Sequence, residues 1–496
     1  MKKNKLAKNT IASLVFQITS ITCGFILPRI ILDRFGSSVN GLVNSITQFL
    51  AIIAFLELGV GAVVQSSLYK PLADKDSDSI SKIMVSANKF FKRLAMILLV
   101  YILILMAGYT YITNSGFDWL YTATLIMVMG ISSFAQYYFG VVDRLLLTAD
   151  QRGYIQYNAQ TITLVLNTVA CVILVKNGAS IHSVRLATSL IYLLRPVFLR
   201  YYINKHYTLN RKITYQGEPI KQKWNGVAQH VAAVVLDSTD NIVLSIFATL
   251  ADVSIYSVYH LVLYGVKTLA LSLTNGIQAM MGELWAKQKR DELGQFFGWV
   301  EWVIHTGTVF VFGCTGVLVV PFVQVYTYGI HDSNYIQPLF ALVLTFAHAA
   351  HCLRLPYSMM ILAGGHYKQT QTNYIVAVLL NVIISVLVVN EWGLIGVAIG
   401  TFAAMSYQTV WMAFYNSKNL LKWPFKKFVK QISTDVITIL VAGLFTQGIE
   451  MEAVNYAAWI FMAIKVAIIW GIVIIVMNVI FYKENVILIR NKILRK

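Results

Sequence analysis

Residues 166–178 read LNTVACVILVKNG, and residues 380–393 read LNVIISVLVVNEWG. The two stretches lie 214 residues apart, and each places an Asn after a Leu at the head of an apolar run. Two further pairs of segments recur at nearly the same spacing, namely 145–154 with 358–367 and 65–75 with 278–288. Because self-similarity at a fixed long period indicates an internally repeated architecture, we expect the two halves of the chain to share one fold.

The composition places this repeat in a membrane. Of the 496 residues, 57% are hydrophobic and only 12% are charged, whereas about 25% of the residues in a soluble domain are charged. A water-soluble enzyme is therefore excluded. The four cysteines lie singly in apolar runs, so neither a disulfide framework nor a zinc site is expected. The apolar stretch near the N-terminus is too long for a cleaved signal peptide and is expected to be a retained helix.

Apolar runs long enough to cross a bilayer, about 20 residues each, predict fourteen transmembrane helices. Their expected ranges are 10–32, 40–67, 93–112, 118–142, 155–175, 181–202, 226–250, 254–282, 297–326, 336–362, 371–389, 393–415, 431–447 and 455–482. Backbone polar groups in lipid must be bonded within their own segment, so each span is expected to be helical. The expected fold class is an all-α membrane protein with two parallel six-helix repeats and two C-terminal helices.

The repeat and the spans divide the chain into five parts. These are an N-lobe (1–202), a cytoplasmic linker (203–225), a C-lobe (226–416), a basic interfacial linker (417–430), and a helix pair with a cytoplasmic tail (431–496). Since six is an even number, both lobes enter the membrane in the same orientation. Parallel repeats of this kind occur in secondary transporters, so we expect the lobes to rock around a site near the membrane midplane.

The net charge of +18 reports mainly on orientation. When the N-terminus is placed in the cytoplasm, 32 of the 40 lysines and arginines fall on the cytoplasmic side and only two on the outer side. This asymmetry is the one that the positive-inside rule requires. A plasma-membrane protein with both termini in the cytoplasm is therefore predicted. Bases scattered over short loops form no continuous surface, so no nucleic-acid partner is expected.

Six basic side chains lie inside the expected spans, where a charge is costly and is by default a functional candidate. The candidates for a cationic substrate-binding cavity are Lys267, Arg354, Arg195, Arg29, Arg185 and Lys465. The first three lie deepest, in the inner half of their helices. For Arg185, snorkelling to the interface is an equally good interpretation. Arg29 lies four residues before Asp33, so a structural pair is an alternative to a substrate contact.

The acidic residues in or beside the spans are candidates for ion coupling or for charge pairing. They are Asp237, Asp240, Glu57 and Asp33. The first two lie three residues apart and point the same way on a helix. Either they bind H+ or Na+ as a coupling ion, or they neutralise Lys267 or Arg354 across the cleft. His348 and His351 are interpreted as a polar helix face, since a metal needs more ligands, and neither a metal nor an organic cofactor is expected.

Several segments resemble one family of membrane proteins. FGSSVNGLVNSITQFLAIIAFLELGVG (35–61) is similar to the first loop and second helix of polysaccharide flippases. LLLTADQRGYIQYN (145–158) and ILAGGHYKQTQTN (361–373) resemble the helix 4–5 and helix 10–11 junctions, and NEWGLIGVAIGT (390–401) resembles the start of helix 12. The GxxxG spacing in the last segment also permits close helix packing. The chain thus resembles the polysaccharide transporter (Wzx-type oligosaccharide flippase) family of the MATE/MOP flippase superfamily.

This resemblance implies two lobes in a V shape and a flippase activity by alternating access. The implied substrate is an undecaprenyl-diphosphate-linked oligosaccharide repeat unit, moved to the outer leaflet of a bacterial plasma membrane for capsule, exopolysaccharide or O-antigen assembly. The implied partners are this lipid-linked oligosaccharide, membrane lipid, a polysaccharide polymerase and chain-length proteins. A cleft rich in bases suits an anionic diphosphate.

Two alternative functions stay open at this point. A MATE-like multidrug or cation antiporter is expected to have more acids than bases in its cleft. A membrane-bound polysaccharide polymerase or glycosyltransferase needs sizeable loops, and the outer loops here are short. We therefore expect a transporter and no enzymatic activity.

Overall fold

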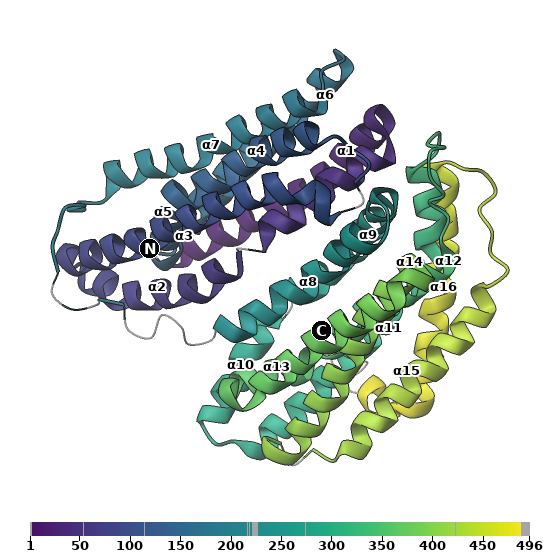
Figure 1. The fold of residues 1–496 in the computed structure, drawn as a ribbon. Helices are drawn as coiled ribbons and strands as arrows, with labels where there is room; N and C mark the ends of the chain where they lie inside the picture. The colour runs from purple at the N-terminus through teal and green to yellow at the C-terminus, as the bar shows by residue number, and fades with distance from the viewer. Residues whose placement is uncertain are drawn as a thin grey trace. The chain divides into compact units, whose positions relative to one another are not determined.

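The structure, a computed structural model, describes residues 2–487 except 53, 114, 216, 218, 221–226, 273 and 422. Every regular element among the described residues is a helix. The chain packs as two compact units, unit 1 (Met1–Ser254) and unit 2 (Ile255–Lys496). In Figure 1 the helices of unit 1 run from purple to teal, and those of unit 2 run from teal to yellow.

Unit 1 is built from helices that pack around α1 and α4. Its elements are α1 (Lys2–Ala51), α2 (Ala54–Asp74), α3 (Ser77–Ile112), α4 (Trp119–Ala135), the π-helix η1 (Gln136–Gly140), α5 (Val141–Ala149), α6 (Gly153–Lys176), α7 (Ile181–His206), α8 (Val227–Phe247) and the start of α9 (Leu250–Ser272). Helix α1 packs against α6 and α8, and α4 packs against α3 and α7. Asp76 and Asp118 begin α3 and α4 as N-caps, because their carboxylates accept backbone N–H groups of the first turn.

Unit 2 is built around the long helix α11. Its elements are the rest of α9, then α10 (Thr274–Ala286), α11 (Arg290–Tyr326), α12 (Pro338–Leu353), α13 (Leu355–Ala363), α14 (Tyr367–Asn419), α15 (Phe425–Thr446) and α16 (Tyr456–Phe481). Helix α11 packs against α12, α15 and α16. The C-terminal helix pair is therefore part of the core of this unit.

Two of the longest helices are bent at a glycine. Gly36 within α1 has φ 79°, and Gly393 within α14 has φ 49° and ψ −122°. Both values lie in the left-handed region, which glycine adopts without a steric penalty. Each of these helices therefore contains residues from two of the expected spans.

The two halves of α14 approach each other closely, as the GxxxG spacing predicts. A Cβ added at Gly396 would lie 2.9 Å from the backbone carbonyl of Val388. One added at Gly400 would lie 2.2 Å from the Ser385 hydroxyl oxygen. Only hydrogen at these two positions leaves room for the facing backbone, which is the usual role of such glycines in membrane helices.

Nine helical segments of the described chain are long and apolar enough to cross a membrane. The chain is therefore a multi-pass membrane protein by the length and composition of its helices. The count of fourteen spans and the predicted lobe boundaries stay predictions. The boundary between the two packing units falls inside α9, because α8 packs on α1 and α2.

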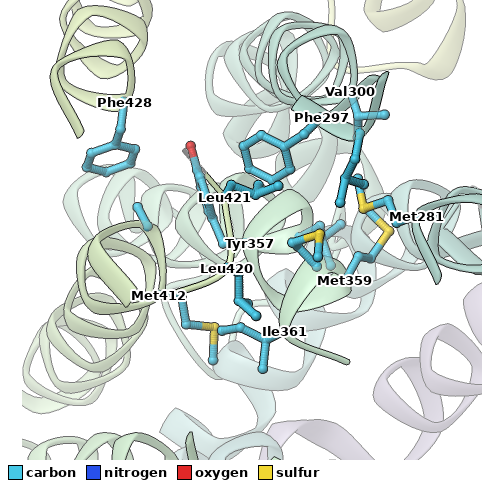
Figure 2. Packing of buried hydrophobic residues seen from close by; sticks show 14 of the residues in the cluster. Met281, Phe297, Val300, Tyr357, Met359, Ile361, Met412, Leu420, Leu421 and Phe428 are labelled. Carbon is cyan, nitrogen blue, oxygen red and sulfur yellow. The ribbon is translucent and has the colours of Figure 1, made fainter. Parts of the chain in front are cut away.

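Two apolar clusters hold unit 2 together. The first joins α10, α11, α13, α14 and α15 through residues such as Met281, Phe297, Tyr357, Met412 and Phe428 (Figure 2). The second joins α11 to α15 and α16 through Val309, Ala442, Val466 and Trp470, among others.

Candidate substrate-binding site

Two adjoining polar cavities lie inside unit 1. Cavity 1 has a volume of about 270 Å³, and its polar lining is Ser132, Ser133, Gln136, Arg144, Gln156, Gln160, Tyr192 and Arg195. Cavity 2 has a volume of about 310 Å³, and its polar lining is Thr47, Ser132, Ser133, Gln136, Tyr137, Arg185, Thr188, Ser189 and Tyr192. Four polar residues belong to both cavities, so the two are neighbours across one wall. None of the described lining residues is Asp or Glu, and three are arginines.

The wall between α4 and α5 is shaped by the π-helix η1. The wider turn ends at Gly140, where an added Cβ would lie 3.2 Å from the Cβ of Pro196 on α7. Glycine therefore allows α7 to approach this turn closely. Short π-helical insertions are frequent at functional sites, and here the insertion directs Gln136 into both cavities.

Arg195 lies along the wall of cavity 1 and is held there by two contacts. Its Nε donates a hydrogen bond to the Thr163 hydroxyl at 2.6 Å. Its guanidinium carbon lies 3.9 Å from the ring centroid of Tyr192, a cation–π geometry. These contacts fix the position of the guanidinium without neutralising its charge, so the charge remains available to an anion in the cavity.

Arg185 lies on α7, as Arg195 does, and lines cavity 2. Among the described residues no group accepts a hydrogen bond from its buried Nε. A buried donor left unbonded costs about 1–3 kcal/mol. An anionic oxygen of a ligand would remove that cost, because a guanidinium presents five donors in a fixed plane.

Arg144 is a third cavity cation, and it forms an ion pair with Glu57 of α2. Arg144 is one of the 32 bases expected on the cytoplasmic side, and Glu57 is a predicted candidate for ion coupling or charge pairing. The structure brings the two together, with Glu57 buried beneath the guanidinium. The Glu57 carboxylate, which does not line cavity 1, therefore neutralises the Arg144 guanidinium, which does.

The remaining candidates of unit 1 lie elsewhere. Arg29 and Asp33 form an i, i+4 ion pair at 3.9 Å, in which Asp33 is largely exposed, and neither lines cavity 1 or 2. Asp240 is buried in α8. The side chain of Asp237 lies outside the described part of the structure. The choice between ion coupling and charge pairing for these two aspartates stays open.

In unit 2 the two deepest cations lie beside aromatic and histidine rings. Lys267 is 3% exposed, and its ammonium lies 4.8 Å from the ring centroid of Tyr264 on the same helix. Arg354 is 8% exposed at the break between α12 and α13, and one of its terminal nitrogens lies 3.3 Å from Nδ1 of His351. His348 on α12 packs against His260 on α9, with ring centroids 5.5 Å apart.

Lys465 is not brought to this region. Its ammonium lies 3.4 Å from a carboxylate oxygen of Glu452, and both side chains are exposed. The six predicted cations therefore separate into cavity-lining arginines of unit 1 (Arg185 and Arg195), buried cations of unit 2 (Lys267 and Arg354), and two that pair with nearby acids (Arg29 and Lys465).

The sequence matches no protein-family model and no curated protein. Among solved structures, the lipid II flippase MurJ in an inward closed conformation is similar over 96% of this chain and 99% of its own, with a TM-score of 0.71 and 15% identity. An inward-facing multidrug resistance MATE transporter of the MOP superfamily is similar over 82% of this chain and 98% of its own, with a TM-score of 0.53 and 14% identity. The eukaryotic MATE transporter AtDTX14 covers 88% of this chain and 99% of its own length, with a TM-score of 0.51 and 12% identity.

The chain shares the fold of these flippase and transporter structures. At such low identity the comparison establishes the fold and carries no residue assignments. The cavities of unit 1 are therefore described by their own side chains.

Sequence reasoning missed several residues of this candidate site. Ser132, Ser133 and Gln136 stand in the sequence as polar residues within an apolar span, a signal comparable to that of a buried base. Arg144 was missed because it follows the end of the expected span. The signal that could have found it was Glu57, since a buried carboxylate in a membrane helix needs a cationic partner.

Proposed function

We propose that this protein is a flippase that moves an undecaprenyl-diphosphate-linked oligosaccharide from the inner to the outer leaflet of a bacterial plasma membrane. The observation that carries the proposal is the extent of the structural likeness. The lipid II flippase fold extends over nearly the whole of this chain, whereas the two MATE transporters cover 82% and 88% of it. A lipid-linked substrate therefore fits this chain better than a soluble drug does.

The chemistry of the two cavities supports an anionic, sugar-bearing substrate. Arg185, Arg195 and Arg144 supply guanidinium groups, the donors best matched to phosphate oxygens. Ser132, Ser133, Gln136 and Tyr192 supply hydroxyl and amide groups of the kind that sugars require. A substrate oligosaccharide for capsule, exopolysaccharide or O-antigen assembly, delivered to a polymerase with its chain-length proteins, follows from this chemistry and from the family resemblance.

The proposed mechanism is alternating access by two parallel six-helix lobes. Left-handed backbone positions support the repeat, because they recur 213 to 215 residues apart along the chain. The pairs are Lys75 with Gln288, Gly116 with Gly329, Gln151 with Gly365, and Gly178 with Gly393. Such positions mark the ends and turns of helices, so their recurrence indicates that helix boundaries as well as sequence motifs are repeated.

The membrane potential is one source of energy for this movement. With both termini in the cytoplasm, the proposed transport carries negative charge outward, which is the direction that an inside-negative potential favours. Each charge then releases about 2.3 kcal/mol per 100 mV. Coupling to H+ or Na+ at Asp237 and Asp240 remains part of the proposal, as does pairing of these aspartates with Lys267 or Arg354.

The direct test is deletion in the host. Cells lacking the protein should accumulate undecaprenyl-diphosphate-linked repeat units on the cytoplasmic leaflet, measured by accessibility of the oligosaccharide to an impermeant enzyme in inverted vesicles. The wild-type gene should restore export, and an Arg185→Gln/Arg195→Gln variant should not. Normal polymer export in the absence of this protein and of any redundant flippase would overturn the proposal.

The alternative of a multidrug or cation antiporter predicts a different cavity. A cationic drug needs carboxylates, and none of the described residues lining cavities 1 and 2 is acidic. Overexpression that raises resistance to cationic drugs, with no change in cell-surface polysaccharide, would favour the antiporter.

A further inference from the structure

Unit 2 contains a chain of buried titratable side chains that takes no part in the cavities. Glu301 and His305 lie on α11, Tyr357 lies on α13, and Asp435 lies on α15. Each of these four side chains is at most 6% exposed as a residue. We call these four residues the relay.

The relay is joined by hydrogen bonds from end to end. The Tyr357 hydroxyl donates to Glu301 Oε1 at 2.7 Å and lies 3.2 Å from His305 Nε2. His305 Nδ1 lies 2.6 Å from Asp435 Oδ2. The remaining carboxylate oxygens are also satisfied, by the Trp423 indole N–H on Glu301 at 2.9 Å and by Gln431 on Asp435 at 2.9 Å.

The hydrogen bonds of the relay require one proton more than its groups ordinarily hold. Three hydrogen bonds join the four side chains, and each needs a proton. Two carboxylates, one phenol and one neutral imidazole together supply only two. When both acids are carboxylates, the third proton makes His305 an imidazolium between them.

The apolar surroundings of the relay make loss of that proton unfavourable. Tyr357 is packed between Phe297 and Phe428, with ring centroids 5.9 Å and 5.5 Å away, inside the first apolar cluster (Figure 2). Removing the proton would leave two carboxylates and no cation in this core, which is strongly unfavourable in a low-dielectric environment. The relay is therefore a place where one proton is bound tightly.

Among the described residues, other charged and titratable groups lie around the edge of the relay. From α15, the Lys427 ammonium lies 3.5 Å from the ring centroid of Trp423. Beyond the end of α16, Tyr482 lies under the ammonium of Lys430, 4.8 Å from its ring centroid. Helix α14 contributes the neutral Asn416, whose amide donates to the Tyr357 backbone carbonyl. Trp423 is only partly buried, so the Glu301 end of the relay is the one nearest to water.

We propose that Glu301, Tyr357, His305 and Asp435 form a proton-binding relay. A proton enters from water onto the Glu301 carboxylate. Glu301 then passes it to the Tyr357 oxygen while the original phenol proton moves to His305 Nε2. Glu301 is again a carboxylate, Tyr357 is again a neutral phenol, and His305 has become an imidazolium, so the net change is one proton gained.

The proton site is tested by nitrogen NMR of full-length protein labelled with 15N-histidine, in detergent micelles at neutral pH. His305→Gln identifies the signals of His305 among the nine histidines. We expect both ring nitrogens of His305 to be protonated in the wild type, and Asp435→Asn to return the ring to the neutral form. A neutral His305 ring in the wild-type protein would overturn the site.

Discussion

Unit 1 and unit 2 both bury charged side chains, but they surround them differently. In unit 1, Arg185 and Arg195 border open cavities and have few fixed partners. In unit 2, Glu301, His305 and Asp435 are packed in an apolar core with their polar atoms bonded to one another. A cavity beside a charged side chain can bind a ligand, whereas a packed set of hydrogen-bonded side chains has room only for a proton. The same residue types thus serve different chemistry in the two units.

The largest expected effect is the loss of stability when Arg144 loses its ion-pair partner Glu57. It tests whether Arg144 depends on that partner or, like Arg185 and Arg195, is stable beside an open cavity. Glu57→Leu leaves the Arg144 guanidinium without its buried partner and should destabilise the protein by about 3 kcal/mol. The measurement is the thermal unfolding midpoint of the purified protein in detergent. The double variant Glu57→Leu/Arg144→Leu should recover most of the loss. A single variant as stable as the wild type would contradict the pairing.

The next effect sharpens the assignment of cavity 2. Arg185→Gln removes a charged donor and should weaken binding of undecaprenyl diphosphate about tenfold or more, because a charge-assisted hydrogen bond contributes about 1.5–3 kcal/mol. Protein stability should be unchanged or slightly higher. Binding is measured by titration of the lipid into labelled protein. Lys465→Gln, which removes an exposed cation outside both cavities, is the matched control and should bind normally.

A third comparison tests how tightly each unit is packed. A Cβ at Gly313 in α11 would lie 1.9 Å from the buried ring of Trp470, so Gly313→Ala should cost about 1–3 kcal/mol. Gly140→Ala faces Pro196 at 3.2 Å beside cavity 1, where the structure has room to relax, and should cost less. Thermal unfolding midpoints provide the measurement.

The control for this comparison is Gly443→Ala on α15. Nothing lies within 4 Å of an added Cβ there, and alanine is a better helix former than glycine by about 1 kcal/mol. This variant should therefore be slightly more stable than the wild type. Equal losses at positions 313 and 140 would contradict the difference in packing between the two units.

The smallest effect gives a baseline for pH responses outside both regions. At the start of α3, the Ser79 hydroxyl and N–H donate to Asp76 and hold the pKa of its carboxyl below the ordinary value. A lowered pKa means that the stabilising effect is present above the ordinary aspartate pKa and is lost as the pH falls through the lowered value. Amide hydrogen exchange at Asp78 and Ser79 should show this loss. Asp76→Asn should show no such pH dependence, and an identical pH profile in that variant would contradict the assignment.

Much of the fold could be predicted from the sequence because apolar length and backbone hydrogen bonding leave few choices in a membrane. The all-helical class and the close approach at Gly396 and Gly400 were predicted from local patterns and were confirmed. The bend at Gly36 was not predicted, because a left-handed glycine and a helical glycine look alike in a sequence.

The candidate site was predicted only in part. Burial of Lys267 and Arg354 follows from their depth in apolar helices, and Arg195 was named for the same reason. The partners of these residues come from other helices, so no local pattern could reveal them. The place of Glu301 near a helix end suggests an interfacial acid, yet it is 3% exposed, because Tyr357 and Trp423 cover it.

The sequence by itself determined that this chain is a bundle of apolar helices, and it predicts that the bases are distributed asymmetrically about a membrane. Those properties depend on hydrophobic length and charge count, which are local quantities. Only the tertiary structure decided which buried charges face a cavity and which face one another. That choice depends on contacts between helices far apart in the chain, such as Arg144 with Glu57 and His305 with Asp435. Because a buried charge is stable only with a partner or a ligand, those contacts separate the residues available to a substrate from those available to a proton.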